Sequence, residues 1–245
     1  MTKMFFEGAD YAEVLKEAQD KGYAERNPEA DVEGHDACRK IAILTSLISG
    51  QHVDFEKIHT EGITKITTED MKYAKTMDMA IKLLASSKRE GESFSAIVAP
   101  MLLSENHPLC NVNDVFNAVF VRGNMLGDAM FYGSGAGKLP TASAVVADVV
   151  DAAKHLHRNV VTRWDAGELE LIPNAEAEHR FFVRVQGRSE AQKEQIREAF
   201  GSVEIVETEG LEDEFGFITE VMTEGTYSKK AEAFPEIIHM IRLAD

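Results

Sequence analysis

Acidic residues and a lysine are concentrated in residues 22–40, which read GYAERNPEADVEGHDACRK. Glu25, Asp31 and Asp36 all precede Lys40 within this stretch. If a helix begins near its end, Asp36 and Lys40 share one helical face, because residues four apart are neighbours there. Two interpretations fit the pattern. It is either a solvated acidic loop that ends in an ordinary helical ion pair, or a site in which carboxylates position a lysine for proton transfer.

The residues around Lys40 favour the second interpretation. Lys40 is followed directly by the apolar run IAIL, so we expect its helix to be mostly buried around the lysine. A buried lysine requires a charged or hydrogen-bonding partner. The preceding loop contains Gly22, Pro28 and Gly34 and supplies more carboxylates than one lysine needs, as a tuned proton-transfer site would.

A second candidate site is the glycine-rich segment YGSGAGKLPTASAVVADV, residues 132–149. Gly133, Gly135 and Gly137 stand at alternate positions just before a predicted helix start, which permits close approach of the backbone to a ligand. The spacing is neither that of a Walker A loop nor that of the GxGxxG dinucleotide fingerprint. A mobile hairpin-to-helix turn that binds nothing explains the same residues.

Composition limits the classes of partner. The chain has 245 residues, 44% of them hydrophobic, and a formal net charge of −16, which disfavours nucleic acid and anionic membrane surfaces. Cys38 and Cys110 form no CxxC motif, and His155 and His157 diverge on a predicted helix, so we expect no metal site. No apolar run reaches the roughly 18 residues of a membrane span, and no signal peptide is evident. We therefore expect a cytoplasmic protein without membrane or nucleic-acid partners.

Apolar periodicity predicts the elements that position these residues. We expect helices at 10–21, 36–49, 67–78 and 141–157. We expect strands at 80–87, 94–103, 115–123 and 128–133, the last two joined as a hairpin. If these strands form one sheet, residues 1–157 make an α+β domain with helices packed on a mixed or antiparallel sheet.

The remainder of the chain predicts a second, smaller domain. Residues 158–178 are polar and contain Gly167 and Pro173, which suits a linker. Residues 179–245 follow the order β-α-β-β-α-β, which is the ferredoxin-like arrangement.

The spaced residues of the opening stretch resemble the signature of homoserine dehydrogenases. The matching positions are Gly22 to Glu25, Asn27-Pro28, Asp31 to Gly34, Asp36 and Lys40. The segments EGITKIT (61–67), IKLLA (81–85), HPL (107–109) and GSGAGKLPTASAVVAD (133–148) are similar to later blocks of that family, in the same order. The resemblance covers nearly the whole chain and is strong through residue 157. It implies an oxidoreductase that interconverts L-homoserine and L-aspartate 4-semialdehyde with NAD or NADP.

The resemblance implies roles for four residues of the signature. Glu25 and Asp36 match carboxylates that hold the substrate through its ammonium group, and Asp31 supports that site. Lys40 matches the lysine that exchanges the proton of the reacting hydroxyl or carbonyl. This agrees with the chemistry, because a hydride can leave an alcohol carbon only if the hydroxyl proton leaves as well.

The cofactor is implied to contact glycines. Gly22 matches a glycine beside the NAD or NADP, and Gly137 and Gly135 belong to the second glycine loop. Members of the family begin with a nucleotide-binding Rossmann domain, and no βαβ unit with a dinucleotide fingerprint precedes Gly22. We therefore expect the catalytic and tail portions of the enzyme, inactive alone, with the choice between NAD and NADP made in the other portion.

The tail, residues 179–245, resembles an ACT domain, a module that relates to threonine feedback in many of these enzymes. Its segment VQGRSEAQKEQ (185–195) lacks the Asp-x-Pro-Gly turn common before the first helix of such modules. Threonine binding and a role only in assembly therefore both stay open. The resemblance also implies a homodimer or higher homo-oligomer, with the four-strand sheet as contact face. The alternative function is a non-catalytic amino-acid-sensing or scaffold protein, which would have no need for Lys40 at this spacing.

Overall fold

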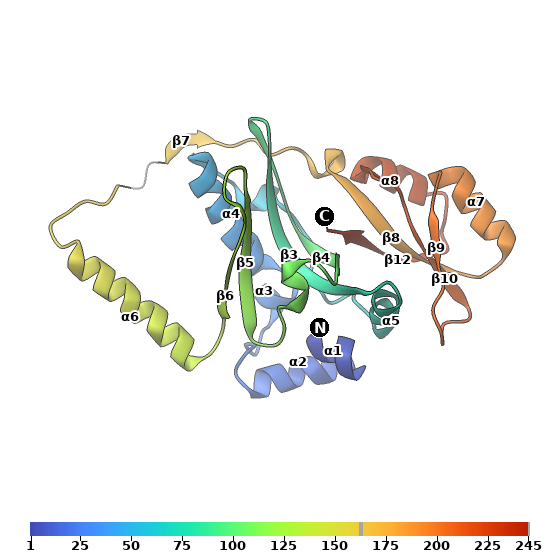
Figure 1. Ribbon diagram of the computed structural model, residues 1–245, viewed down its shortest axis with the longest axis horizontal. Helices are drawn as coiled ribbons and strands as arrows, with labels where there is room; N and C mark the ends of the chain where they lie inside the picture. The colour runs from blue at the N-terminus through green and yellow to red at the C-terminus, as the bar shows by residue number, and fades with distance from the viewer. Residues whose placement is uncertain (162–163, 245) are drawn as a thin grey trace.

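The computed structural model describes residues 1–161 and 164–244 (Figure 1). Residues 162 and 163 of the expected linker, and residue 245 at the end of the expected tail domain, lie outside the described residues. In chain order the elements are α1 (Thr2–Glu7), α2 (Tyr11–Asp20), α3 (Glu29–Val32), α4 (His35–Ser49), β1 (Gln51–His52), η1 (Phe55–Lys57), β2 (His59–Thr60), α5 (Thr68–Thr76), β3 (Met79–Glu90), β4 (Ser93–Ser104), η2 (Pro108–Asn111), β5 (Phe116–Gly123), β6 (Gly127–Ser134), α6 (Lys138–Lys154), β7 (Asp165–Glu168), η3 (Asn174–Glu176), β8 (Glu178–Gln186), α7 (Glu190–Phe200), β9 (Glu204–Val206), β10 (Glu214–Ile218), β11 (Met222–Thr223), α8 (Glu224–Ala231) and β12 (Ile237–Leu243).

Local sequence signals explain where the helices begin and end. Asp10 caps α2 by accepting a hydrogen bond from the backbone N–H of Ala12 at 2.8 Å. Thr67 and Asp70 form a reciprocal capping box at the start of α5. Gly34 and Gly50, with φ of +77° and +75°, flank α4 in the left-handed conformation that glycine adopts most easily. The four predicted helices are confirmed, although α6 begins three residues earlier than expected, with Pro140 in its first turn.

The main sheet has eight strands. It runs through both the N-terminal half, residues 1–157, and the tail, residues 179–245. Its order is β2-β4-β12-β8-β10-β9, with β3 on β4 and β11 on β8. The tail strands β12-β8-β10-β9 are antiparallel neighbours, which confirms the predicted ferredoxin-like order. β12 also pairs in parallel with β4, through Arg242 and Leu243, so the tail continues the sheet of the N-terminal half (Figure 1).

The expectation that the first four strands share one sheet is wrong. β3 and β4 pair along their full length, but among residues 1–161 and 164–244 β5 and β6 pair only with each other, in a separate two-stranded sheet. The second edge of β4 is already occupied, by β2 at Ile97 and Val98 and by β12 further along, so it cannot accept the hairpin. A strand pattern predicts the strands themselves, but it does not predict their partners.

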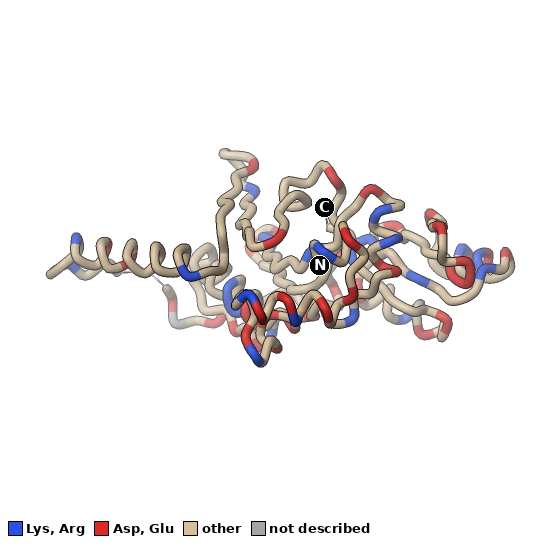
Figure 2. Tube along the Cα trace, turned by 90° about the horizontal axis from the view of Figure 1, so that it is seen from below, with Lys and Arg blue, Asp and Glu red and all other residues tan. Residues whose placement is uncertain are grey.

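Apolar side chains hold these layers together in clusters. One cluster packs α1 and α5 against the tail and includes Met71, Tyr73 and Phe182. We call this contact between the N-terminal half and the tail the seam. A second fills the tail between its sheet and its helices, and a third packs α4 against β4. Helix α6 has no buried residue and projects away from the body (Figures 1 and 2). Within residues 1–161 and 164–244, no helix is both long and apolar enough to cross a membrane.

Candidate active site

Asp36 and Lys40 form an ion pair at the start of α4, as the sequence predicts. The Lys40 Nζ atom lies 2.6 Å from Oδ2 of Asp36, one helical turn earlier. The pair is exposed, however, since 71% of the Lys40 side chain and 50% of the Asp36 side chain are accessible to solvent. The expectation that Lys40 sits in a buried part of its helix is therefore wrong.

The two faces of α4 explain that error. One face is buried and carries Cys38, Ala42, Thr45 and Ser46. The other face carries Lys40 and, three to eight residues further along, apolar residues that remain exposed. These are Ile43, Leu44, Leu47 and Ile48, between 38% and 69% exposed. The apolar run after Lys40 thus predicts an apolar surface correctly, but nothing among the described residues covers it. Lys40 lies at the end of this uncovered stripe.

Glu25, Asp31 and Gly22 lie in the turns that lead into α4. Gly22 follows α2 with φ of +72°. The side-chain amide of Gln19 donates to the backbone carbonyl of Glu25 at 2.9 Å and so holds this turn against α2. Asp31 lies in the single turn of α3. Both carboxylates are exposed, and among the described residues neither forms an ion pair with Lys40.

The second glycine loop connects β6 to α6. Gly137 is the residue before α6 and has φ of +120°, a conformation that side-chain-bearing residues rarely adopt. At Gly135 a Cβ atom would lie 1.8 Å from Nδ2 of Asn117, so a larger residue there would have to displace the Asn117 side chain. No hydrogen bond or ion pair of the described residues joins this loop to residues 22–40.

The glycines differ in the space they offer to a dinucleotide cofactor. A Cβ atom at Gly22 would meet nothing within 4 Å, and one at Gly137 would meet only the ring of Pro140, at 3.5 Å. The backbone at both positions is therefore open to close approach, which fits the predicted cofactor contacts. The space at Gly22 and Gly137 therefore permits a cofactor contact, whereas the space at Gly135 is filled by Asn117.

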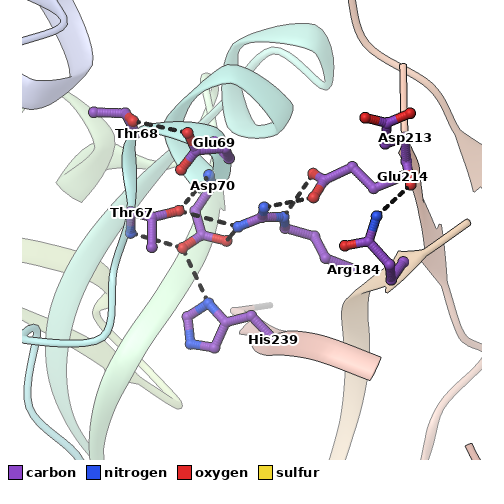
Figure 3. Close-up of polar contacts among 9 residues, drawn as sticks. Thr67, Thr68, Glu69, Asp70, Arg184, Asp213, Glu214 and His239 are labelled. Atoms are coloured by element: carbon purple, nitrogen blue, oxygen red, sulfur yellow. Dashed lines mark hydrogen bonds and ion pairs between the residues drawn. The ribbon is translucent and has the colours of Figure 1, made fainter. Parts of the chain in front are cut away.

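Sequence reasoning missed two buried arginines at the seam between the tail and the N-terminal half. Arg184 on β8 donates to both carboxylate oxygens of Glu214, at 2.8 and 3.0 Å, and to Asp70 on α5 at 2.8 Å (Figure 3). His239 on β12 contacts the other oxygen of Asp70 through Nδ1 at 3.0 Å. Burial alone would raise the pKa of Asp70, but hydrogen bonds from His239, the Thr67 backbone and Arg184 outweigh it and lower that pKa.

The second arginine, Arg242 on β12, is arranged in the same way. It donates to Glu61 of the N-terminal half at 2.8 and 2.9 Å and to Glu224 of the tail at 3.0 Å. Burial alone would raise the pKa of Glu61, but hydrogen bonds and positive charge from His59 and Arg242 lower it to about 2. The signal in the sequence was an arginine inside each apolar strand pattern, FFVRV and IHMIRL.

Comparison with known proteins identifies one family. The family model described as homoserine dehydrogenase matches residues 1–150. The homoserine dehydrogenase of Bacillus subtilis (strain 168) is 46% identical over 160 residues, which cover 65% of this chain and 37% of the relative. That of Mycobacterium tuberculosis is 37% identical over 250 residues, which cover 94% of this chain and 57% of the relative. The chain thus spans from about a third to somewhat more than half of these relatives.

Solved structures agree with these relatives. The crystal structure of a homoserine dehydrogenase from Thiobacillus denitrificans superposes with a TM-score of 0.87 at 32% identity, over 100% of this chain and 61% of that one. A hyperthermophilic archaeal homoserine dehydrogenase mutant, solved in complex with NADPH, superposes with a TM-score of 0.50 at 29% identity, over 65% and 44% of the two chains.

Proposed function

Because the chain belongs to the homoserine dehydrogenase family, we propose that it supplies the substrate-binding part of an enzyme that interconverts L-homoserine and L-aspartate 4-semialdehyde. The observation that carries this proposal is the Asp36–Lys40 pair, placed in the first two turns of α4 directly after the acidic loop. Its uncovered position suits a site that is closed by another part of the enzyme. In a non-catalytic sensor or scaffold the same pair would contribute only the roughly 0–1 kcal/mol of stability of an exposed ion pair.

Lys40 is proposed to exchange the proton of the reacting oxygen. In the reducing direction its ammonium group gives a proton to the carbonyl oxygen of the semialdehyde as the carbonyl carbon accepts a hydride. In the oxidising direction the neutral amine takes the hydroxyl proton while the hydride leaves the same carbon. Asp36 holds the Nζ atom in place at 2.6 Å. Glu25 and Asp36 bind the substrate's ammonium group, and Asp31 supports them from α3.

NAD or NADP supplies the hydride acceptor or donor when it is bound. Gly22 and Gly137 are proposed to let the backbone approach the cofactor, and Gly135 shapes the loop that holds Gly137. The archaeal relative solved with NADPH supports a nicotinamide dinucleotide in the family. The exposed apolar face of α4 is proposed to contact the nucleotide-binding part of the enzyme, which would remove water from around Lys40.

Lys40→Ala tests this role in a chimera in which the whole 245-residue chain, tail included, replaces the B. subtilis relative from the start of the matching segment onward. We expect kcat to fall by roughly 10²- to 10⁴-fold, as for loss of a general acid–base group, with little change in KM. Lys57→Ala is the control, because Lys57 is also exposed and paired, at 2.5 Å from Glu168, but lies outside the signature. A loss confined to KM would mean that Lys40 only binds.

A homo-oligomer is proposed from the β5–β6 hairpin, because an isolated two-stranded hairpin with an apolar surface is rarely stable. The exposed apolar residues of this hairpin are Phe116, Val119, Val121, Met125, Leu126, Met130, Phe131 and Tyr132. Sedimentation should show a dimer or larger species that Phe131→Glu dissociates, while Phe6→Glu on α1 leaves it intact. A native chain that sediments as a monomer would contradict this assembly.

The tail is proposed to be an ACT-like module, supported by its ferredoxin-like strand order. Threonine is the effector to test, because ACT modules relate to threonine feedback in many of these enzymes. Both outcomes are open, since the segment at 185–195 lacks the turn common before the first helix of such modules. If the tail binds threonine, isothermal titration of the chain gives a saturable signal. If it acts only in assembly, titration with threonine gives none.

A further inference from the structure

Arg242 ties the last strand of the chain to a segment 181 residues earlier. Only 2% of its side chain is exposed, and its guanidinium bridges Glu61 of the N-terminal half and Glu224 of the tail. Glu61 in turn contacts His59 at 2.6 Å, so its carboxylate is held from two sides. The backbone N–H of Glu61 also donates to Val98 of β4 at 2.7 Å. Glu61 is therefore a fixed point at the seam.

The residues that follow Glu61, together with it, form a strap over the loop before α4; the strap is residues 61–66. A Cβ atom at Gly62 would lie 2.4 Å from the carbonyl oxygen of Val32, so only glycine allows this contact. The backbone N–H of Ile63 donates to the same carbonyl at 2.7 Å. The Thr64 hydroxyl donates to the Glu33 carboxylate at 2.9 Å. The strap thus contacts Val32 and Glu33 through one close approach of the backbone and two hydrogen bonds.

These two residues immediately precede Gly34, the residue before α4. Gly34 is buried, and its own Cβ position would lie 3.0 Å from Cγ1 of Val98 and 3.5 Å from the carbonyl oxygen of Glu61. The strap and β4 therefore fix the turn at Gly34, and that turn sets the direction of the helix that carries Asp36 and Lys40. A cavity of about 160 Å³ lies between the strap and β12, so the strap has space to shift if its anchor is loosened.

Arg184 is a matched comparison for Arg242. It is equally buried, at 4% exposed, and it also bridges a carboxylate of each half, Asp70 and Glu214. In the N-terminal half it contacts Thr67, Asp70 and the ring of Tyr73, all on α5 or at its start. Among the described residues it makes no hydrogen bond or ion pair with the strap or the Gly34 turn. The two arginines are therefore matched in burial and charge but differ in what they hold.

We propose that Glu61 and Arg242 are positioning residues, through which the tail sets the geometry of the turn that presents Asp36 and Lys40. The consequence for catalysis rests on the proposed function. The contact path itself, from Arg242 through Glu61 and Gly62 to the Gly34 turn, does not.

The first test uses the 245-residue chain and hydrogen exchange. Glu61→Gln and Arg242→Lys should speed exchange at the backbone amides of Ile63 and Cys38, which bond to Val32 and Gly34. We expect the increase in exchange rate to be about fivefold larger than in Arg184→Lys, as for residues that couple two sites. The variants are compared under conditions in which their global free energies of unfolding are equal. Equal exchange in Arg242→Lys and Arg184→Lys would overturn the proposal. Because Glu61→Gln keeps the shape of the side chain, it gives an answer even if Arg242→Lys fails to fold.

The second test uses steady-state kinetics in the B. subtilis chimera. Glu61→Gln should raise the KM for L-homoserine by about tenfold, because Asp36 is displaced from the substrate, while Arg184→Lys leaves KM within about twofold of the unmodified chimera. An equal change of KM in both variants would show that the seam affects only stability. If the unmodified chimera has no activity, the proposed function fails, and the exchange experiment still decides the positioning role.

Discussion

The seam and the signature both contain ion pairs, but the ion pairs of the seam are formed by buried arginines, whereas the ion pair of the signature is exposed. At the seam, Arg184 and Arg242 are at most 4% exposed, and each is hydrogen-bonded to a carboxylate from both halves of the chain. In the signature, Asp36 and Lys40 form one exposed pair beside an uncovered apolar stripe. At the seam the partners of both arginines are among the described residues. In the signature, charged and apolar side chains face outward. The first arrangement fits a structural joint and the second fits a surface that a substrate and another part of an enzyme cover.

The energetic consequences should differ accordingly. Removing one member of a buried, hydrogen-bonded ion pair leaves an uncompensated charge and costs about 3–5 kcal/mol. An exposed pair contributes about 0–1 kcal/mol, because water screens it. Substitutions at the seam should therefore change stability, and substitutions in the signature should change chemistry. Three measurements test this contrast.

Arg184→Met should produce the largest loss of stability. It leaves Asp70 and Glu214 buried without their cation, so we expect the free energy of unfolding to fall by about 3–5 kcal/mol. Urea denaturation of the native chain and the variant measures this. Arg180→Met is the control, since Arg180 lies on the same strand with 42% of its side chain exposed. A loss as small as that of the control would remove the distinction between the two regions.

Acid should weaken the seam through Glu61. Its pKa is about 2 in the folded chain and 4.5 in its ordinary environment, so the folded state holds the ionised form more strongly. The stability that Glu61 contributes is therefore complete above about pH 4.5 and is lost as the pH falls towards 2. The difference in unfolding free energy between the native chain and Glu61→Gln should shrink over this range in urea titrations. A difference that stays constant down to pH 2.5 would contradict this account of the Glu61–Arg242 ion pair.

Asp36→Asn should have the smallest effect on stability. It breaks an exposed pair, so the free energy of unfolding should change by less than about 1 kcal/mol. The same urea denaturation measures it beside Arg184→Met. A loss as large as that of Arg184→Met would mean that Asp36 is a structural residue, and the proposed substrate contact would lose its support.

The sequence predicted the elements better than their neighbours. The helices follow from apolar spacing and from caps such as Asp10 and Thr67, which act within one turn of chain. Most strands were also predicted, but β1, β2 and β7 were not, and β7 lies in the expected linker. The pairing of β12 with β4 and the isolation of the β5–β6 hairpin depend on contacts between distant segments. No local pattern carries that information.

In the candidate site, too, the local contact was predicted and the features that depend on distant segments were not. The four-residue spacing of Asp36 and Lys40 fixes their contact, because it depends only on helix geometry. The exposure of Lys40 could not be predicted, since the apolar run beside it shows that a face is apolar but not whether another element covers it. Arg184 and Arg242 were missed because an arginine in a strand is ordinarily assumed to face water. Their burial depends on carboxylates supplied by distant parts of the chain.

The most direct test of the central claim is turnover with L-aspartate 4-semialdehyde and NADPH or NADH, followed by cofactor absorbance. The chain should be inactive alone, since it is proposed to hold the substrate and not to bind most of the cofactor. The B. subtilis chimera should oxidise the cofactor at a measurable rate that depends on Lys40. Robust turnover by the 245-residue chain alone, or a folded chimera without turnover, would contradict the account.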